Sequence, residues 1–195
     1  MKIGLYGDST QVGLSIYAGV GYQADWPPSK LLQVMLDYKY GHGVHTVSNY
    51  GVRGSTLWQA MSTGLYSGQN ILNHVTAQGD DIVFMNFGIN DCYVAGYTPA
   101  AHKANYGAVK ASVESMGKIF VYESPNPIDN THDPLLQALD AAVKTIPGIR
   151  NMDTYTQVKT YYPQWTGHLS DTIHPNYIMY FYEGDLLFKA VDSLL

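Results

Sequence analysis

Five short apolar runs recur along the chain, and a cluster of turn-forming residues follows each of them. The runs are rich in Ile, Val, Phe and Tyr, which is typical of parallel strands that are buried on both faces. They lie at residues 2–6, 44–49, 81–87, 118–123 and 149–152. The pattern therefore predicts five buried strands rather than half-exposed strands with strict alternation.

Longer stretches with helical periodicity separate these runs. Thr98 and Pro99 are typical of an N-cap and of the first helical position, and Asp133 with Pro134 repeats that pair. Pro147 and the glycine after it favour a helix end near residue 146. The expected helices cover about residues 30–36, 56–65, 69–77, 99–116, 134–146 and 176–194.

This alternation of strands and helices predicts an α/β fold, a three-layer α/β/α sandwich around a five-stranded parallel sheet. A single domain over residues 1–195 is expected, because domains commonly run about 100–200 residues and no Pro/Gly/Ser-rich linker divides the chain. In such sheets ligands bind beyond the carboxyl ends of the strands. Functional residues are therefore sought directly after each run.

Composition removes several functional classes. The net charge is −5 and no Lys/Arg cluster occurs, which argues against nucleic-acid binding. The longest apolar runs are too short to insert into a membrane, and residues 1–6 are too short for a signal peptide. Cys92 is the single cysteine, so neither an internal disulfide nor a cysteine-based zinc site is expected.

Polar residues stand where the predicted strands end. Ser9 follows the first run, a glycine-rich loop at residues 49–56 follows the second, and Asn90 follows the third. Asp171 and His174 lie three residues apart before the last helix. A hydroxyl nucleophile needs a base, a group that orients the base, and donors for the developing oxyanion. All of these groups are present, although each motif alone is more often only a turn or a helix cap.

The joint occurrence of these motifs resembles the SGNH hydrolases, also called the GDSL-type esterase/lipase family. That family carries four sequence blocks in a fixed order, and together they are more specific than any one of them. The matching residues span most of the chain and are Gly7-Asp8-Ser9, Gly54, Gly88-Ile89-Asn90-Asp91 and Asp171-Thr172-Ile173-His174. The resemblance implies a flavodoxin-like fold with five parallel strands, which agrees with the count of apolar runs.

The resemblance also implies roles for these residues. Ser9 would be the nucleophile, His174 the general base and then the acid, and Asp171 the group that orients the imidazole. The backbone N–H groups of Ser9 and Gly54, with the side chain of Asn90, would form the oxyanion hole. The family needs no metal and no cofactor, and no cluster of metal ligands stands out in the sequence.

The choice of the oxyanion glycine and the residue after Ser9 need comment. Gly51 is a second candidate for the oxyanion glycine, but Gly54 is favoured because the family glycine typically precedes a small or acidic residue and then Thr, as in residues 54–56. Thr10 stands where the family name has Leu, at a variable position. Asp8 is expected to brace the turn around Ser9.

Tyrosine is unusually frequent, with 17 residues in 195. Tyr93 and Tyr97 lie after the third block, and Trp165 and His168 precede Asp171 in sequence; Arg53 adjoins Gly54. These residues are candidates for substrate binding, because aromatic side chains with polar ends suit surfaces that contact sugars. Closing the rim against water is the alternative role for the aromatic rings, and an ordinary surface position is the alternative for Arg53.

The sequence thus leads to one functional hypothesis and two alternatives. The first is a serine esterase that removes a short acyl group, expected to be acetyl, from a carbohydrate, so that its substrate is a small-molecule or polysaccharide ester. The alternatives are a lysophospholipase- or thioesterase-type acyl hydrolase, and a non-catalytic carbohydrate-binding domain on a hydrolase scaffold. No export signal is expected in the chain as given, and both a bacterial enzyme and a phage structural domain acting on polysaccharide fit such a chain.

Overall fold

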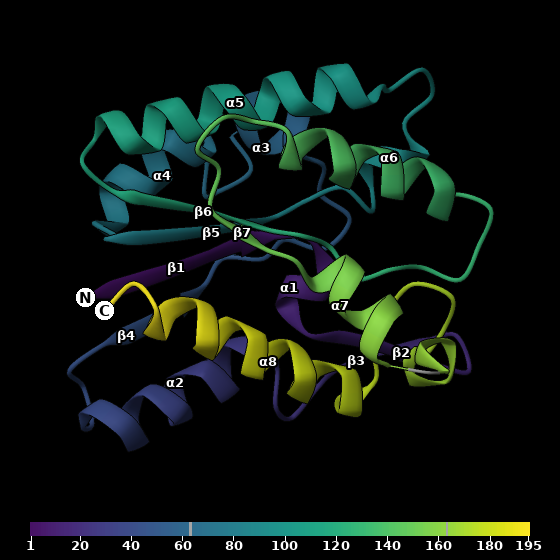
Figure 1. Ribbon diagram of the computed structural model, residues 1–195, viewed down its shortest axis with the longest axis horizontal. Helices are drawn as coiled ribbons and strands as arrows, with labels where there is room; N and C mark the ends of the chain where they lie inside the picture. The colour runs from purple at the N-terminus through teal and green to yellow at the C-terminus, as the bar shows by residue number, and fades with distance from the viewer. Residues whose placement is uncertain (63, 163) are drawn as a thin grey trace.

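The computed structural model describes residues 1–62, 64–162 and 164–195. Its main sheet has five parallel strands in the order β4-β1-β5-β6-β7 (Figure 1). In chain order these strands are β1 (Lys2–Gly7), β4 (Thr46–Asn49), β5 (Ile82–Asn86), β6 (Ile119–Glu123) and β7 (Asn151–Met152). Each of the five apolar runs therefore forms one strand of a single parallel sheet, which confirms the predicted α/β fold.

Helices surround this sheet. All six expected helices are present, with ends that differ slightly from the sequence-based ranges, and shorter elements occur between them. The helices are α1 (Ser9–Val12), α2 (Pro28–Tyr40), α3 (Leu57–Ser62), α4 (Ile71–Gln78), α5 (Pro99–Ser115), α6 (Asp133–Lys144), α7 (Thr154–Tyr161) and α8 (Tyr177–Asp192), and the 3-10 turns are η1 (Asp91–Tyr93) and η2 (Trp165–His168). The sequence patterns did not predict α1, α7, η1 or η2.

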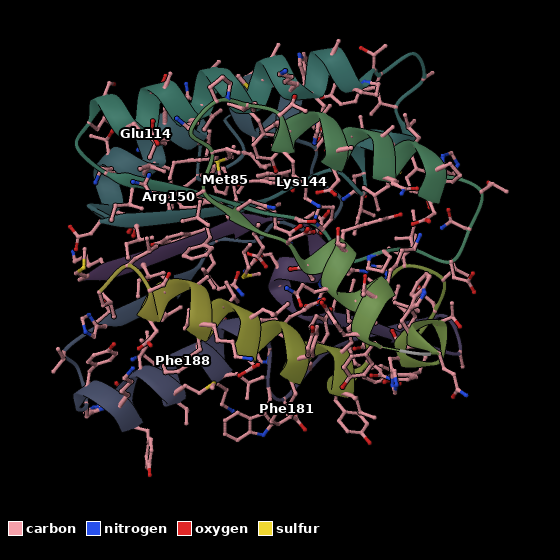
Figure 2. The ribbon with its side chains drawn as sticks, viewed as in Figure 1. Met85, Glu114, Lys144, Arg150, Phe181 and Phe188 are labelled. Atoms are coloured by element: carbon pink, nitrogen blue, oxygen red, sulfur yellow. The ribbon has the colours of Figure 1, made fainter. Side chains whose placement is uncertain are left out.

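The side chains of β5 show how the sheet separates two apolar layers. Phe84 belongs to a buried cluster with Leu36 of α2 and Leu187 of α8. Its neighbour Met85 points to the opposite face and joins a cluster with Val109 of α5. Figure 1 shows α2 and α8 on one side of the sheet and α3 to α6 on the other, and Figure 2 shows Met85 on the α5 side. Because both faces are covered, the inner strands β1, β5 and β6 are buried along most of their length. The prediction of five buried strands was wrong for the two edge strands: no residue of β4 is buried, and only Met152 of β7 is.

The two predicted proline-containing helix starts differ in outcome. Thr98 caps α5, since its hydroxyl oxygen accepts a hydrogen bond from the backbone N–H of Ala101. Asp133 does not cap α6 but is its first residue, and the cap position belongs to His132. The carboxylate of Asp133 instead accepts from the Tyr155 hydroxyl at 2.9 Å. The other carboxylate oxygen accepts from Lys159 Nζ, so both oxygens that a cap would use are bound to α7, and the predicted cap was wrong.

A hairpin outside the main sheet, β2 (Leu14–Tyr17) and β3 (Val20–Gln23), was also not predicted. Its two-residue turn is Ala18-Gly19, and both residues have positive φ angles, +49° and +77°. Such turns usually carry Asn or Asp before Gly, because those residues tolerate the left-handed region better than Ala does. The turn therefore gave no recognisable hairpin signal.

The topology brings the functional loops to one edge. All five sheet strands run parallel, so their carboxyl ends point the same way. In Figure 1 the two chain termini lie together at the opposite end, while α1, α7 and the β2–β3 hairpin gather at the carboxyl end. Among the described residues, no helix combines the length and apolar character needed to cross a bilayer.

Candidate active site

Ser9 is the first residue of α1, directly after the buried strand β1. Asp8 precedes it and caps this one-turn helix: its Oδ1 accepts from the backbone N–H and from the hydroxyl of Thr10, both at 2.9 Å. Asp8 itself is fully buried. The expectation that Asp8 braces the turn agrees with these contacts, which fix the backbone on either side of Ser9.

The structure brings Ser9, His174 and Asp171 together from opposite ends of the chain. The Oγ of Ser9 lies 2.9 Å from Nε2 of His174. The Nδ1 of the same imidazole lies 3.0 Å from Oδ2 of Asp171. An ionised carboxylate can only accept, so Nδ1 carries the ring proton and Nε2 is left to accept the proton of the serine hydroxyl. The three groups thus form a continuous hydrogen-bonded chain.

The loop before α8 holds Asp171 in place. Its Oδ1 accepts from the backbone N–H groups of Ile173 at 2.7 Å and His174 at 2.6 Å. Partial burial pushes the pKa of Asp171 upward, but the hydrogen bonds from His174 and Ile173 outweigh it, so that the pKa lies below its ordinary value. The Asp171 carboxylate therefore stays ionised and keeps orienting the ring over a wide pH range.

The backbone N–H groups of Ser9 and Gly54 are left without an acceptor among the described residues. Gly54 has a φ of +71° with open space around a would-be Cβ, so the left-handed backbone rather than crowding requires glycine there. This geometry is compatible with an oxyanion hole formed by the two N–H groups.

Gly51, the rival glycine, has a different position. Its N–H already donates to the Asn49 side chain at 2.9 Å. A Cβ at residue 51 would lie 2.8 Å from the backbone nitrogen of Val12 and 3.0 Å from the backbone oxygen of Asp8. Gly51 therefore allows the loop to approach α1 closely, and its N–H is not free to bind a ligand.

Asn90 follows β5, and its side chain contacts the segments that carry Ser9 and Gly54. Its Nδ2 donates to Oδ2 of Asp8 at 3.2 Å and to the backbone oxygen of Ser55 at 3.1 Å. Both amide hydrogens are thus engaged within the protein. Donation to a substrate oxyanion would have to replace one of these two long bonds, and the bond to Asp8 is the longer of the two.

The next two residues complete the third block. The buried carboxylate of Asp91 accepts from the backbone N–H of Leu57 and so ties η1 to the start of α3. Burial raises the pKa of Asp91 to about 7, against the lowering effect of the Leu57 N–H. Burial and the neighbouring Asp91 raise the pKa of the Cys92 thiol to about 12, so this cysteine is a neutral packing residue.

A cavity of about 330 Å³ adjoins the loop that carries Asn90. Tyr97, one of the predicted substrate contacts, lines it together with Val94 and Trp58. Trp58 is 58% exposed on α3, and it was not among the residues predicted to bind substrate. The one available sequence signal was a tryptophan only four residues after Gly54, but its place in an expected helix made it look like an ordinary helix residue.

The remaining candidates are Tyr93, Trp165, His168 and Arg53, and the three aromatic ones contact neighbouring side chains. The ring of Tyr93 lies 4.0 Å from that of His132, and the ring of His168 lies 5.1 Å from that of Tyr162. The Nζ of Lys159 on α7 lies 5.6 Å from the ring of Trp165. Arg53 is exposed next to Gly54. These contacts support a rim for the aromatic residues and leave direct substrate contact as a prediction.

The family comparison agrees with the arrangement of blocks. A family model described as the GDSL-like Lipase/Acylhydrolase family matches residues 5–180. No curated protein matches the sequence.

Solved structures with low sequence identity share the fold. The lipase/acylhydrolase from Enterococcus faecalis is 20% identical with a TM-score of 0.78, covering 100% of this chain and 96% of that chain. The acetyl xylan esterase AlAXEase is 16% identical with a TM-score of 0.76, and the match covers 98% of this chain and 100% of that chain. Axe2, an acetylxylan esterase from Geobacillus stearothermophilus, is 16% identical with a TM-score of 0.71, and the match covers 98% of this chain and 92% of that chain. Because the family match spans most of the sequence, the chain belongs to the GDSL-like lipase/acylhydrolase family.

Proposed function

We propose that this chain is a serine esterase that hydrolyses short acyl esters, with an O-acetyl group on a carbohydrate as its substrate. Membership of an acylhydrolase family supports ester hydrolysis as the reaction class. The single observation that carries the proposal is the hydrogen-bonded chain from Ser9 through His174 to Asp171, with separations of 2.9 and 3.0 Å.

In the proposed reaction, Ser9 Oγ attacks the ester carbonyl carbon while Nε2 of His174 takes the hydroxyl proton. The backbone N–H groups of Ser9 and Gly54 stabilise the negative oxygen that forms, together with the Asn90 amide once it gives up its hydrogen bond to Asp8. The imidazolium then gives its proton to the leaving alcohol, and an acyl-serine remains. Water attacks the acyl-serine with His174 again as the base, which releases the acid and restores the serine.

A carbohydrate substrate has separate support. Two of the structurally similar proteins are described as acetyl xylan esterases, although identities of 16% limit that likeness to the fold. Exposed tyrosines occur around the carboxyl end of the sheet, among them Tyr93 at 44% exposure. Tyrosine suits a surface that is apolar on one side and hydrated on the other, as a sugar ring requires.

The chain-length dependence of ester hydrolysis tests this proposal. Purified protein would be assayed with p-nitrophenyl acetate, butyrate and octanoate, and with an acetylated xylo-oligosaccharide. We expect kcat/KM to fall as the acyl chain lengthens and the sugar acetate to be a substrate. A Ser9→Ala variant should lose all turnover above background. Rates that rise steeply toward octanoate would contradict the acetyl assignment, and unchanged turnover in Ser9→Ala would remove Ser9 from the mechanism.

One observation favours a longer acyl chain as the second candidate. The cavity lined by Trp58, Val94 and Tyr97 adjoins the Asn90 loop and is largely apolar. If it holds an acyl chain, Trp58→Ala should lower kcat/KM for the octanoate ester and leave the acetate ester nearly unchanged. Equal effects on both esters would exclude an acyl-chain role for this cavity.

A further inference from the structure

A second cavity lies on the β2–β3 hairpin, beside the start of α8. It has a volume of about 290 Å³, and three tyrosines line it: Tyr17 from β2, Tyr22 from β3 and Tyr177 from α8. Ser15, Gln23, Ala24 and Asp25 complete the lining. We call this the tyrosine cavity. It shares no lining residue with the cavity at Trp58, Val94 and Tyr97.

Hydrogen bonds join the hairpin that carries this cavity to the loop of His174. The hydroxyl of Ser15 donates to the backbone oxygen of Pro175 at 2.8 Å. The N–H of Ile16 donates to the hydroxyl oxygen of Ser170 at 2.8 Å, and that hydroxyl donates to the backbone oxygen of His174 at 3.0 Å. The tyrosine cavity is therefore held in a fixed position relative to the imidazole that faces Ser9.

The three tyrosines are unusually exposed for aromatic residues. Tyr17 is 47% exposed, Tyr22 is 54% exposed and Tyr177 is 64% exposed. The rings of Tyr17 and Tyr22 lie diagonally across the hairpin with centroids 6.4 Å apart, tilted by 45°. Clustered exposed rings on a small hairpin that stands outside the main sheet indicate a binding surface rather than packing.

The chemistry of the lining fits a neutral sugar better than an acyl chain or an acidic ligand. Tyrosine rings offer apolar faces for the C–H face of a pyranose, and their hydroxyls lie at the wet edge. The Gln23 amide and the Asp25 carboxylate add hydrogen-bonding groups of the kind that accept from sugar hydroxyls. Among the described residues that line the cavity, Asp25 alone is charged, and its negative charge disfavours anionic ligands.

We propose that the tyrosine cavity binds a sugar unit of a neutral glycan next to the unit whose ester lies at Ser9. The inference rests on the proposed esterase function and adds to it a preference for oligomeric over monomeric substrates. Binding energy gained at the cavity is present in both ground and transition states, so it should act mainly through KM.

Kinetics on substrates of different length test this inference. Tyr22→Ala and Tyr177→Ala would be compared with wild type on acetylated xylohexaose, on acetylated xylose and on p-nitrophenyl acetate. We expect each variant to raise KM for the hexaose by roughly five- to tenfold, because one aromatic contact contributes about 1 kcal/mol. Activity on the two small substrates should stay within about twofold. Tyr22→Phe keeps the ring and should retain most of the wild-type KM.

Tyr38→Ala is the matched control, because Tyr38 is 94% exposed on α2 and lies outside the cavity. It should behave as wild type on all three substrates, and circular dichroism with thermal unfolding would confirm that every variant is folded. Equal KM values for the hexaose in wild type, Tyr22→Ala and Tyr177→Ala would overturn the proposal.

Direct binding separates this inference from the proposed function. Isothermal titration of the Ser9→Ala variant with unacetylated xylo-, cello- and chitohexaose should detect binding of at least one glycan, weakened by Tyr22→Ala. Binding to none of the three, or binding that Tyr22→Ala leaves unchanged, would overturn the inference. Absence of turnover of any ester by the wild type would instead overturn the proposed function.

Discussion

At the scale of single residues, Gly51 and Gly54 show what local backbone geometry decides. Both lie in the loop after β4, and the sequence alone did not separate them by any physical argument. In the structure the Gly51 N–H is used by Asn49, whereas the Gly54 N–H donates to no described residue. The same residue type thus serves close packing at one position and a left-handed backbone at the other.

Alanine at each glycine should separate these two roles. Gly54→Ala has room for its Cβ, so it should cost about 1 kcal/mol of stability while lowering kcat/KM by at least about tenfold, because the strained backbone would turn its N–H away. Gly51→Ala meets backbone atoms and should cost about 1–3 kcal/mol. Urea unfolding and p-nitrophenyl acetate kinetics measure both effects, and a fully active Gly54→Ala would contradict the assignment.

The sequence motifs grouped Ser9, Asp171 and His174 into one expected site because they occur in the family's order along the chain, and their catalytic roles stay a prediction. No local sequence pattern could show that the side chains of Ser9 and His174 come into contact, because the fold alone brings these distant residues together. Trp58 shows the opposite case: its exposure depends on tertiary packing, so helical spacing made it look ordinary.

Among the elements, the strands formed by continuous apolar runs were predictable from the sequence. The short, more polar β2–β3 hairpin and helix α7 were not. The β2–β3 hairpin turns at Ala18-Gly19, which lacks the usual turn residues, and β3 is exposed along its whole length. Helix α7 has only eight residues and a polar sequence. Short helices and two-stranded hairpins are marginal on their own and depend on packing against the rest of the protein. The local sequence of these two elements was therefore too weak a signal to predict them.

The contact between α2 and α8 gives a prediction at this scale. A Cβ at Gly184 of α8 would lie 2.8 Å from the Cβ of Leu31 on α2, so Gly184→Ala should lower the free energy of unfolding by about 1–3 kcal/mol. Gly107 on α5 has open space around it, and Gly107→Ala should raise stability by about 0.5–1 kcal/mol. Thermal unfolding would show Tm changes of opposite sign, and equal signs would contradict the packing.

At the scale of the whole molecule, the sheet buries acidic residues as well as apolar ones. Glu123 ends β6 and is 2% exposed, and Glu183 of α8 is 5% exposed. One oxygen of each carboxyl group has no hydrogen-bond partner among the described residues. The three-layer architecture was predictable from strand and helix order, but these buried acids were not, because a glutamate at a strand end usually faces water.

Glu123 makes stability depend on pH. Burial, with the nearby Asp8 carboxylate, raises the pKa of Glu123 from 4.5 to about 8, although Asn86 donates to it. The folded state therefore favours the protonated acid: its contribution is complete below about pH 4.5 and is lost as pH rises toward about 8.

Glu123→Gln should remove the loss of stability that Glu123 causes as pH rises. We expect the variant to be more stable than wild type at pH 8 by on the order of 2–4 kcal/mol, with a much smaller difference at pH 5. Urea unfolding at the two pH values measures this. A stability difference that is the same at both pH values would contradict the linkage.

Covalent labelling would show whether Ser9 is an activated nucleophile. The protein would be treated with a fluorophosphonate, which reacts with activated serines, and the modified peptide would be identified by mass spectrometry. We expect one label on Ser9, strongly slowed labelling in His174→Ala, and normal labelling in the surface control Ser115→Ala. A label at another residue, or no label on protein that hydrolyses p-nitrophenyl acetate, would contradict the proposed role of Ser9.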